Sequence, residues 1–198
     1  KNNKSSVTID EGELVSFYVD GKEYIHQKGN KGWRRSDIEM FPVIGPTKKN
    51  AFLVHTKHGD AVQDQHGLLR ELPYTLVSES DNQVKFKKSY TKNTWINNSK
   101  YPAKSTEEFM FWPFDFVFEK KFTFKNEVLT IDFMIQSEEG MPFMLGYHPA
   151  FLLSDTGEES LISNQKKITL DDVLKAGANA FPILKSEEII LVNYDKSN

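Results

Sequence analysis

Five phenylalanines at even spacing constrain the fold of this chain more than any other feature of its sequence. They are Phe114, Phe116, Phe118, Phe122 and Phe124. Side chains alternate between the two faces of an extended backbone, so even spacing places all five rings on one face of one long strand. Between the two groups of rings, residues 119–121 (Glu-Lys-Lys) are expected to decorate a break in the stripe.

A second strand with the same alternation follows directly. Lys125-Asn126 predicts a turn into Val128–Ile135, where apolar residues again recur at every second position. Stacking platforms for nucleic acids need exposed aromatic rings interleaved with cations, and the sequence lacks that pattern here. We therefore interpret the aromatic stripe as core filling.

The remaining strand signals are short and numerous. They lie at Val7–Ile9, Leu14–Val19, Lys22–His26, Asn50–His58, Tyr74–Ser78, Val84–Tyr90, Glu107–Trp112 and Phe181–Val192. Two longer segments are predicted to be loops: Gly29–Gly45 and Asp60–Arg70. Only Leu170–Ala176 has helical character, with Asp171 and Asp172 placed for a helix start. Many strands, little helix and no βαβ alternation predict an all-β fold, an antiparallel β-sandwich formed as a single domain over residues 1–198.

Composition excludes several classes of protein and of site. With 38% hydrophobic residues among 198, the chain can bury a real core, and disorder is not expected. A net charge of −3 without a basic stripe argues against a nucleic-acid partner. The chain has no cysteine, which removes disulfides and thiolate chemistry and fits a cytoplasmic location. No apolar run approaches the roughly 20 residues of a membrane-spanning helix, so no membrane partner is expected.

His148 stands near the end of the apolar run Phe143–Phe151, where Pro149 prevents further strand pairing. A lone histidine at this place is most simply a cap of the strand. A second histidine, His66, lies in similar company within Gln65–Arg70. Imidazole titrates near neutral pH and can give or take a proton at a sugar oxygen or a carbonyl. The two histidines together therefore indicate a functional site.

Arginine and aromatic side chains supply further candidates for this site. Arg34, Arg35 and Arg70 offer planar donors for hydroxyl pairs, carboxylates or phosphates. Trp33 and Tyr147 offer flat apolar faces to a sugar ring. Each residue alone has a structural explanation, as a solvated cation or a core aromatic. Together they predict a polar and aromatic pocket.

His55 and His58 have the spacing of a metal-ligand pair when taken in isolation. On a strand they would point to opposite faces, and no clear third ligand follows. We interpret them as a solvated loop pair, and we expect neither a metal nor an organic cofactor.

Four motifs in series resemble the aldose 1-epimerase (galactose mutarotase-like) family, and most closely its branch of LacX-like proteins and hexose-6-phosphate mutarotases. In chain order they are Trp33-Arg34-Arg35 leading into Met40–Gly45, then Gln65–Arg70, Trp112–Phe116 and Gly146–Phe151. Their order and spacing agree with the family over roughly Val7–Leu153. The resemblance implies a β-supersandwich whose concave face binds a small-molecule sugar, a hexose or a hexose phosphate.

The resemblance also implies roles for individual residues. His148 matches the family's acid, which protonates the ring oxygen while a carboxylate removes the proton from the anomeric hydroxyl. The ring opens, the aldehyde turns, and reclosure gives the other anomer. His66 and Arg70 match residues that hold sugar hydroxyls or orient the site, and Arg34 is expected to be a further contact with the ligand.

The carboxylate base is where this sequence departs from the family. The family's base is a glutamate in a Glu-Pro context near the C-terminal end, and Glu187 and Glu188 do not match it. We therefore expect a fold that lacks its C-terminal strands, either through truncation or with loss of catalysis. Two hypotheses follow: an isomerase that interconverts sugar anomers, and a non-catalytic carbohydrate-binding β-sandwich. A β-domain unrelated to sugars would require all four motifs to be coincidental.

Overall fold

The computed structural model describes residues 4–30, 35–153, 157–163, 166–176 and 189–192. The chain forms two compact units, Lys1–Ala150 and Phe151–Asn198, and each is described by itself. A single domain over residues 1–198 stays a prediction.

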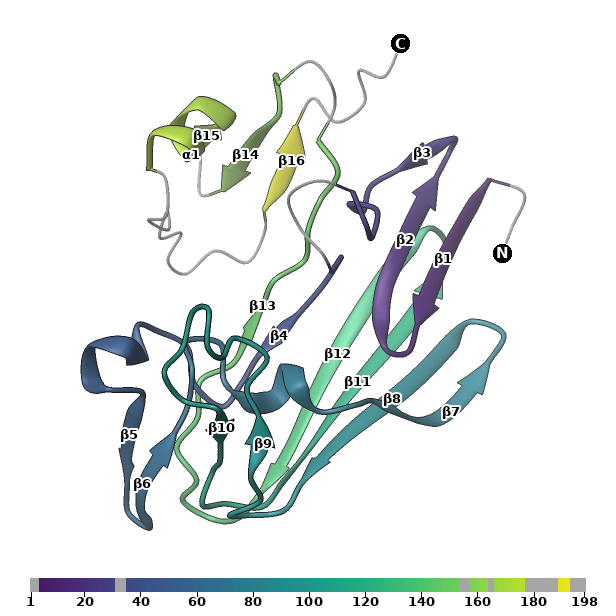
Figure 1. The fold of residues 1–198 in the computed structure, drawn as a ribbon. Helices are drawn as coiled ribbons and strands as arrows, with labels where there is room; N and C mark the ends of the chain where they lie inside the picture. The colour runs from purple at the N-terminus through teal and green to yellow at the C-terminus, as the bar shows by residue number, and fades with distance from the viewer. Residues whose placement is uncertain (1–3, 31–34, 154–156, 164–165, 177–188, 193–198) are drawn as a thin grey trace. The chain divides into compact units, whose positions relative to one another are not determined.

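An antiparallel sheet of four strands is the centre of the first unit (Figure 1). Its strands, in spatial order, are β12 (Val128–Ser137), β11 (Phe116–Lys125), β8 (Gln83–Tyr90) and β7 (Thr75–Ser80). The long hairpin β11–β12 turns at Asn126 and Glu127, which both have positive φ. Its register sets Phe118 opposite Ile135 and Phe122 opposite Ile131, so the two predicted apolar stripes face the same way.

The aromatic stripe is confirmed as core filling, with two corrections. Phe116, Phe118 and Phe122 are buried on one face of β11. Phe114 is also fully buried, but it lies before the strand, in a bend that follows Pro113, whose ring nitrogen cannot donate to a ladder. Lys120 does not decorate a break: β11 runs through it without interruption, and its side chain is buried among the rings.

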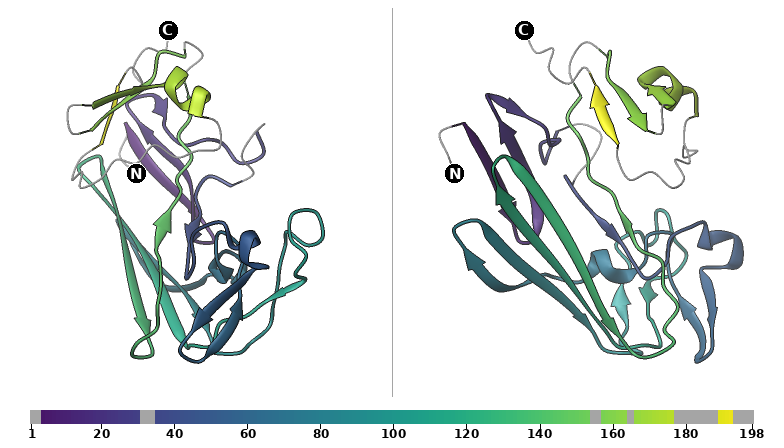
Figure 2. Two further views of the ribbon diagram at one scale, coloured as in Figure 1. Left: turned by 90° about the vertical axis from the view of Figure 1, so that its left-hand side faces the viewer. Right: turned by 180° about the vertical axis from the view of Figure 1, so that it is seen from behind.

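A three-stranded antiparallel sheet packs beside the first one (Figure 2). It consists of β1 (Ser5–Asp10), β2 (Glu13–Val19) and β3 (Lys22–Glu23), and a hairpin turn at Asp20-Gly21 joins the last two. Leu14 of β2 and Ile25 share a buried cluster with Phe86 and Phe122 of the larger sheet. Two sheets with a common core make a sandwich, as the sequence predicts.

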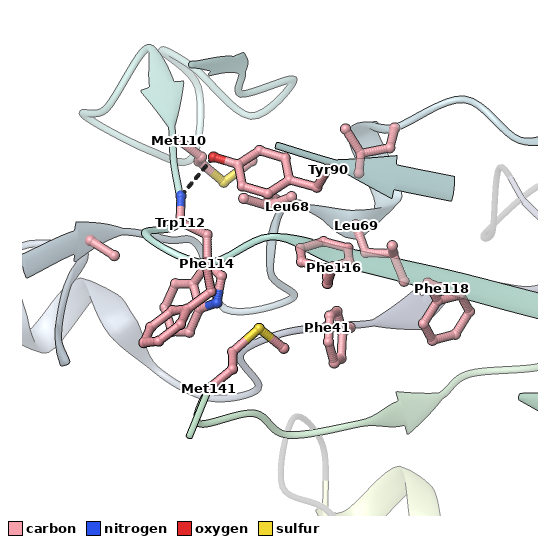
Figure 3. Close-up of a cluster of buried hydrophobic side chains, with 12 residues drawn as sticks. Phe41, Leu68, Leu69, Tyr90, Met110, Trp112, Phe114, Phe116, Phe118 and Met141 are labelled. Carbon is pink, nitrogen blue, oxygen red and sulfur yellow. Dashed lines mark hydrogen bonds between the residues drawn. The ribbon is translucent and has the colours of Figure 1, made fainter. Parts of the chain in front are cut away.

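A larger core cluster lies at the other end of the long strands (Figure 3). Phe41 meets Phe116 edge to face, with ring centroids 5.0 Å apart. Tyr90 closes the cluster with its hydroxyl, which donates to the carbonyl of Thr94 (2.6 Å) and accepts from the amide of Trp112 (2.8 Å). One phenol therefore ties both ends of the segment between β8 and β11.

Short paired strands complete the first unit. They are β4 (Glu39–Met40) with β13 (Gly146–Tyr147), β5 (Leu53–Thr56) with β6 (Gly59–Val62), and β9 (Ile96–Asn97) with β10 (Phe109–Met110). Two 3-10 helices, η1 (Thr47–Asn50) and η2 (Leu68–Glu71), lie between them. The prediction of a loop over Asp60–Arg70 is therefore wrong at both ends, where β6 and η2 form.

The second unit contains one described helix and three short strands. The strands β14 (Ser160–Ser163), β15 (Lys166–Thr169) and β16 (Ile190–Val192) form an antiparallel sheet in the order β15-β14-β16. The helix α1 (Leu170–Ala176) is confirmed at its predicted bounds. Thr169 and Asp172 cap it reciprocally, because the Thr169 amide donates to Asp172 Oδ2 (2.9 Å) and the Asp172 amide donates to Thr169 Oγ1 (3.2 Å).

The described residues thus form an all-β protein with antiparallel sheets, as predicted. Among them, no helix is both long and apolar enough to cross a membrane. Of the predicted strand Phe181–Val192, residues 181–188 lie outside the described part of the chain, and β16 forms the rest.

Candidate functional site

Main-chain hydrogen bonds bring the segments of His66 and His148 to the same short stretch, residues 38–41. The His148 amide donates to the Ile38 carbonyl (2.8 Å), and the Ile38 amide donates back to the His148 carbonyl (3.3 Å). The Phe41 amide donates to the carbonyl of His66 (3.2 Å). The stretch that contains β4 therefore lies between both histidine-bearing segments (Figure 1).

The hydrogen bond between Arg70 and His66 defines the tautomer of the imidazole. Arg70 Nη1 lies 3.0 Å from His66 Nδ1, and a guanidinium can only donate. Nδ1 must therefore accept, which places the ring proton on Nε2. Arg70 is held by a buried ion pair with Asp64 and by Glu71, whose Oε1 accepts from Nε at 2.8 Å.

His66 is neutral near pH 7. Burial lowers its pKa to about 4, and the positive charges of Lys100 and Arg70 act in the same direction, against the smaller raising effect of Asp64. A neutral imidazole with its proton on Nε2 is a hydrogen-bond donor to an oxygen and carries no charge of its own.

Gly67 permits the close approach that seats His66. Its backbone has φ 71° and ψ 170°, a combination that is essentially restricted to glycine. A Cβ at this position would lie 2.2 Å from the carbonyl oxygen of Phe41. The sequence His-Gly therefore has a local physical reason, and η2 begins at the next residue.

Tyr147 is the last residue of β13, and His148 directly follows the strand. Tyr147 donates its hydroxyl to Asp37 Oδ2 (2.9 Å), and its ring centroid lies 5.2 Å from that of Phe133. His148 is exposed, as an acid that meets a ligand needs to be. The structure therefore joins His66 to Arg70, brings the segment of His148 to the same stretch 38–41, and bonds Tyr147 to a second group.

That second group consists of charged residues which sequence reasoning missed. Lys120 Nζ lies 2.6 Å from Asp37 Oδ2 and is also bonded to Glu39, and all three side chains are buried. Burial raises the pKa of Asp37. At Glu39 the effect of burial is outweighed by Lys120 and Lys88, which lower its pKa. The even spacing of Lys120 with the phenylalanines was the one available signal that it faces the core.

A polar cavity of about 710 Å³ adjoins both groups. Its lining includes Arg35, Asp37, Glu39, Arg70 and Lys88. Neither histidine lines it, so we place the candidate chemistry on the exposed side of His66 and His148 rather than in this cavity. Burial lowers the pKa of Lys88 to about 8.

The other predicted site residues have different places. Trp33 and Arg34 lie outside the described residues. His55 is exposed and pairs with Asp60 (Nδ1 to Oδ1, 2.6 Å), while His58 stacks on Phe114 with centroids 4.6 Å apart. Where the structure describes the chain, no three histidine, cysteine or acidic side chains are grouped to hold a metal ion.

A family model for aldose 1-epimerases matches residues 52–196. The chain belongs to the aldose 1-epimerase family. A search of curated protein sequences gave no match.

Two solved structures show the same fold. A galactose mutarotase related enzyme from Lactobacillus acidophilus is 23% identical with a TM-score of 0.63, over 83% of this chain and 53% of that one. A galactose mutarotase-like protein from Lactobacillus casei has the same identity and TM-score, over 83% of this chain and 54% of that one. The chain thus spans about half the length of these structures, and the galactose mutarotase-like fold is confirmed.

Proposed function

We propose that this member of the aldose 1-epimerase family interconverts the α and β anomers of a hexose by acid–base ring opening. His148 donates a proton to the ring oxygen, while His66 Nε2 and Arg70 hold sugar oxygens. Arg34 is a further contact, and Trp33 and Tyr147 are proposed as aromatic neighbours of the ligand. The reaction also needs a carboxylate base, and the sequence contains no Glu-Pro pair of the kind that the resemblance implies.

The observation that carries this proposal is the arrangement of His66, Arg70 and His148. Ring opening moves one proton onto a ring oxygen and another off the anomeric hydroxyl, so an acid must meet the sugar without a competing charge beside it. His66 is held neutral with an N–H to offer, and the segment of the exposed His148 reaches the same stretch 38–41. In this arrangement His148 acts as the acid, and His66 acts as an uncharged hydrogen-bond donor.

The test is anomer exchange with the natural full-length protein. Magnetisation exchange between the α and β H1 signals of glucose and galactose, and of their 6-phosphates, measures the rate. We expect acceleration by the wild type, its loss in His148→Asn, and no change in the control His55→Asn, an exposed histidine. Equal rates in wild type and His148→Asn would defeat the assignment.

The second candidate, a non-catalytic carbohydrate-binding sandwich, has a different signature. It predicts saturation-transfer signals from a bound sugar without faster anomer exchange in the wild type. The hexose-6-phosphate mutarotase branch and a cytoplasmic location stay predictions.

A further inference from the structure

Two lysines of the central sheet are buried on the same face. Lys120 of β11 is fully buried and Lys88 of β8 is 4% exposed. The register sets Lys120 opposite Phe86 and Lys88 opposite Phe118, so the two lysines are diagonal neighbours on adjacent strands. Buried lysines are rare unless they are paired, and each of these has a defined partner.

Lys120 is bonded to residues 37–39, the stretch that pairs with the segment carrying His148. Its ammonium reaches Asp37 at 2.6 Å and also Glu39 of β4, and it lies 5.3 Å from the ring centroid of Tyr147 in β13. Tyr147 donates to the same Asp37, and the β4–β13 ladder has only two residue pairs. The short strand pair before His148 is thus fixed to the sheet by one ammonium group.

Lys88 is bonded to the segment that carries His66. Its Nζ donates to the carbonyl of Leu69 in η2 at 3.0 Å, and it lies 4.1 Å from the ring centroid of Tyr74. Leu69 directly precedes Arg70, the residue that fixes the tautomer of His66. The Leu69 amide in turn donates to the carbonyl of Phe41 (3.0 Å).

We propose that Lys88 and Lys120 are positioning residues of the candidate site, each anchoring one of its two histidine-bearing segments to the same sheet face. Neither lysine touches a sugar in this proposal. A buried ion pair contributes little net stability compared with a well-packed apolar replacement, so stability alone gives no reason for charges here. Specific, directional contacts of this kind can instead fix the spacing between the two imidazoles.

Amide hydrogen exchange of the full chain, followed by NMR, tests the anchors one at a time. Lys120→Met is expected to speed exchange at the Ile38 and His148 amides at least tenfold, with Leu69 unchanged. Lys88→Met is expected to do the reverse. Amides of the β11–β12 ladder keep their protection in both variants, and Lys120→Arg restores much of the protection at Ile38 and His148.

Matched controls come from the same strands. Lys87→Met and Lys121→Met remove lysines that are not buried, and both are expected to leave the exchange rates of the Ile38, His148 and Leu69 amides as in wild type. If Lys120→Met does not fold, the triple variant Asp37→Asn, Glu39→Gln, Lys120→Met removes the charges together at nearly constant volume. Wild-type protection at His148 in that folded variant would overturn the proposal.

The anchoring proposal rests on the proposed function for its effect on catalysis, and two measurements, amide exchange and anomer exchange, test the two claims separately. Anomer exchange in Lys120→Met is expected to show a lower kcat with little change in KM, because the acid is displaced while His66 and Arg70 stay in place. A wild type without anomer exchange would sink the proposed function and leave the amide test standing. Unchanged protection in both methionine variants, or uniform loss that includes β12, would overturn the anchoring proposal whatever the activity.

Discussion

Replacing Gly67 by alanine would place a methyl group where the structure has no room for one. The added Cβ would lie 2.2 Å from the carbonyl oxygen of Phe41 and 2.4 Å from its carbonyl carbon. Contacts below 3.0 Å do not occur for real Cβ atoms, so one backbone segment must move by roughly 1 Å in a close-packed core. Phe41 resists this movement because it is fully buried and its carbonyl accepts from the Leu69 amide.

The expected cost has two parts. A non-glycine residue in this φ/ψ region costs about 1–3 kcal/mol, and overpacking costs about 1–3 kcal/mol more. We therefore expect Gly67→Ala to lower the free energy of unfolding by about 4 kcal/mol, a large part of the about 5–15 kcal/mol that a domain has. His66 is displaced by the same movement, so anomer exchange should fall with it.

Gly29→Ala is the matched control. Gly29 also has a positive φ (94°), but an added Cβ would meet nothing within 4 Å. The left-handed conformation alone costs about 1–2 kcal/mol, and the entropy that alanine removes from the unfolded chain is the same in both variants. Urea unfolding of the two variants isolates the steric part. An equal loss of stability in both would refute the argument from crowding against Phe41.

Two further perturbations address the electrostatics and the core. Lys100→Met is expected to raise the pKa of His66 from about 4 toward 6.5. An NMR titration that monitors the Cε1–H signal of His66 measures this pKa, and the exposed Lys104→Met is the control. The pKa of His66 in the folded protein lies below its ordinary value of 6.5, so neutral His66 contributes stability above pH 6.5 that is lost as the pH falls toward 4. Lys100→Met should narrow the pH range over which this stability is lost. An unchanged titration curve would exclude Lys100 as a cause of the low pKa of His66. Tyr90→Phe removes a hydrogen bond to the Thr94 carbonyl and leaves the buried Trp112 amide unpaired, which is expected to cost about 1–3 kcal/mol in urea unfolding. The exposed Tyr18→Phe should cost under about 0.5 kcal/mol. Equal midpoints for the two tyrosine variants would contradict the role given to the Tyr90 hydroxyl.

Elements governed by neighbouring residues were predictable from the sequence. The alternation in residues 116–124 and 128–135 defines β11 and β12, and Thr169 with Asp172 accounts for the start of α1. The wrong interpretation of Lys120 has a non-local cause. Its two carboxylate partners lie 83 and 81 residues away, and without them a buried ammonium is too costly to predict.

The sequence predicted which residues belong to the candidate site, but not which contacts hold them in place. His66, Arg70 and His148 were identified from their motifs, and the structure joins His66 to Arg70 and brings the segment of His148 to the same stretch 38–41. The direction of Tyr147 depends on Asp37, 110 residues earlier in the chain, which no local pattern reveals. The anchoring role of Lys88 was equally hidden, because a lysine on a predicted strand is normally solvated.

The main-chain bonds of residues 38–41 have a consequence for how freely this site can be altered. The positions of His66 and His148 depend on the amides and carbonyls of Ile38 and Phe41, which every residue except proline possesses. The side chains of Ile38 and Met40 are therefore open to exchange in a redesign of ligand preference, with proline excluded at 38 and 41. Ile38 lines the cavity of about 710 Å³, so a library at position 38 would vary the wall of that cavity while the main-chain bonds to both histidine segments are kept.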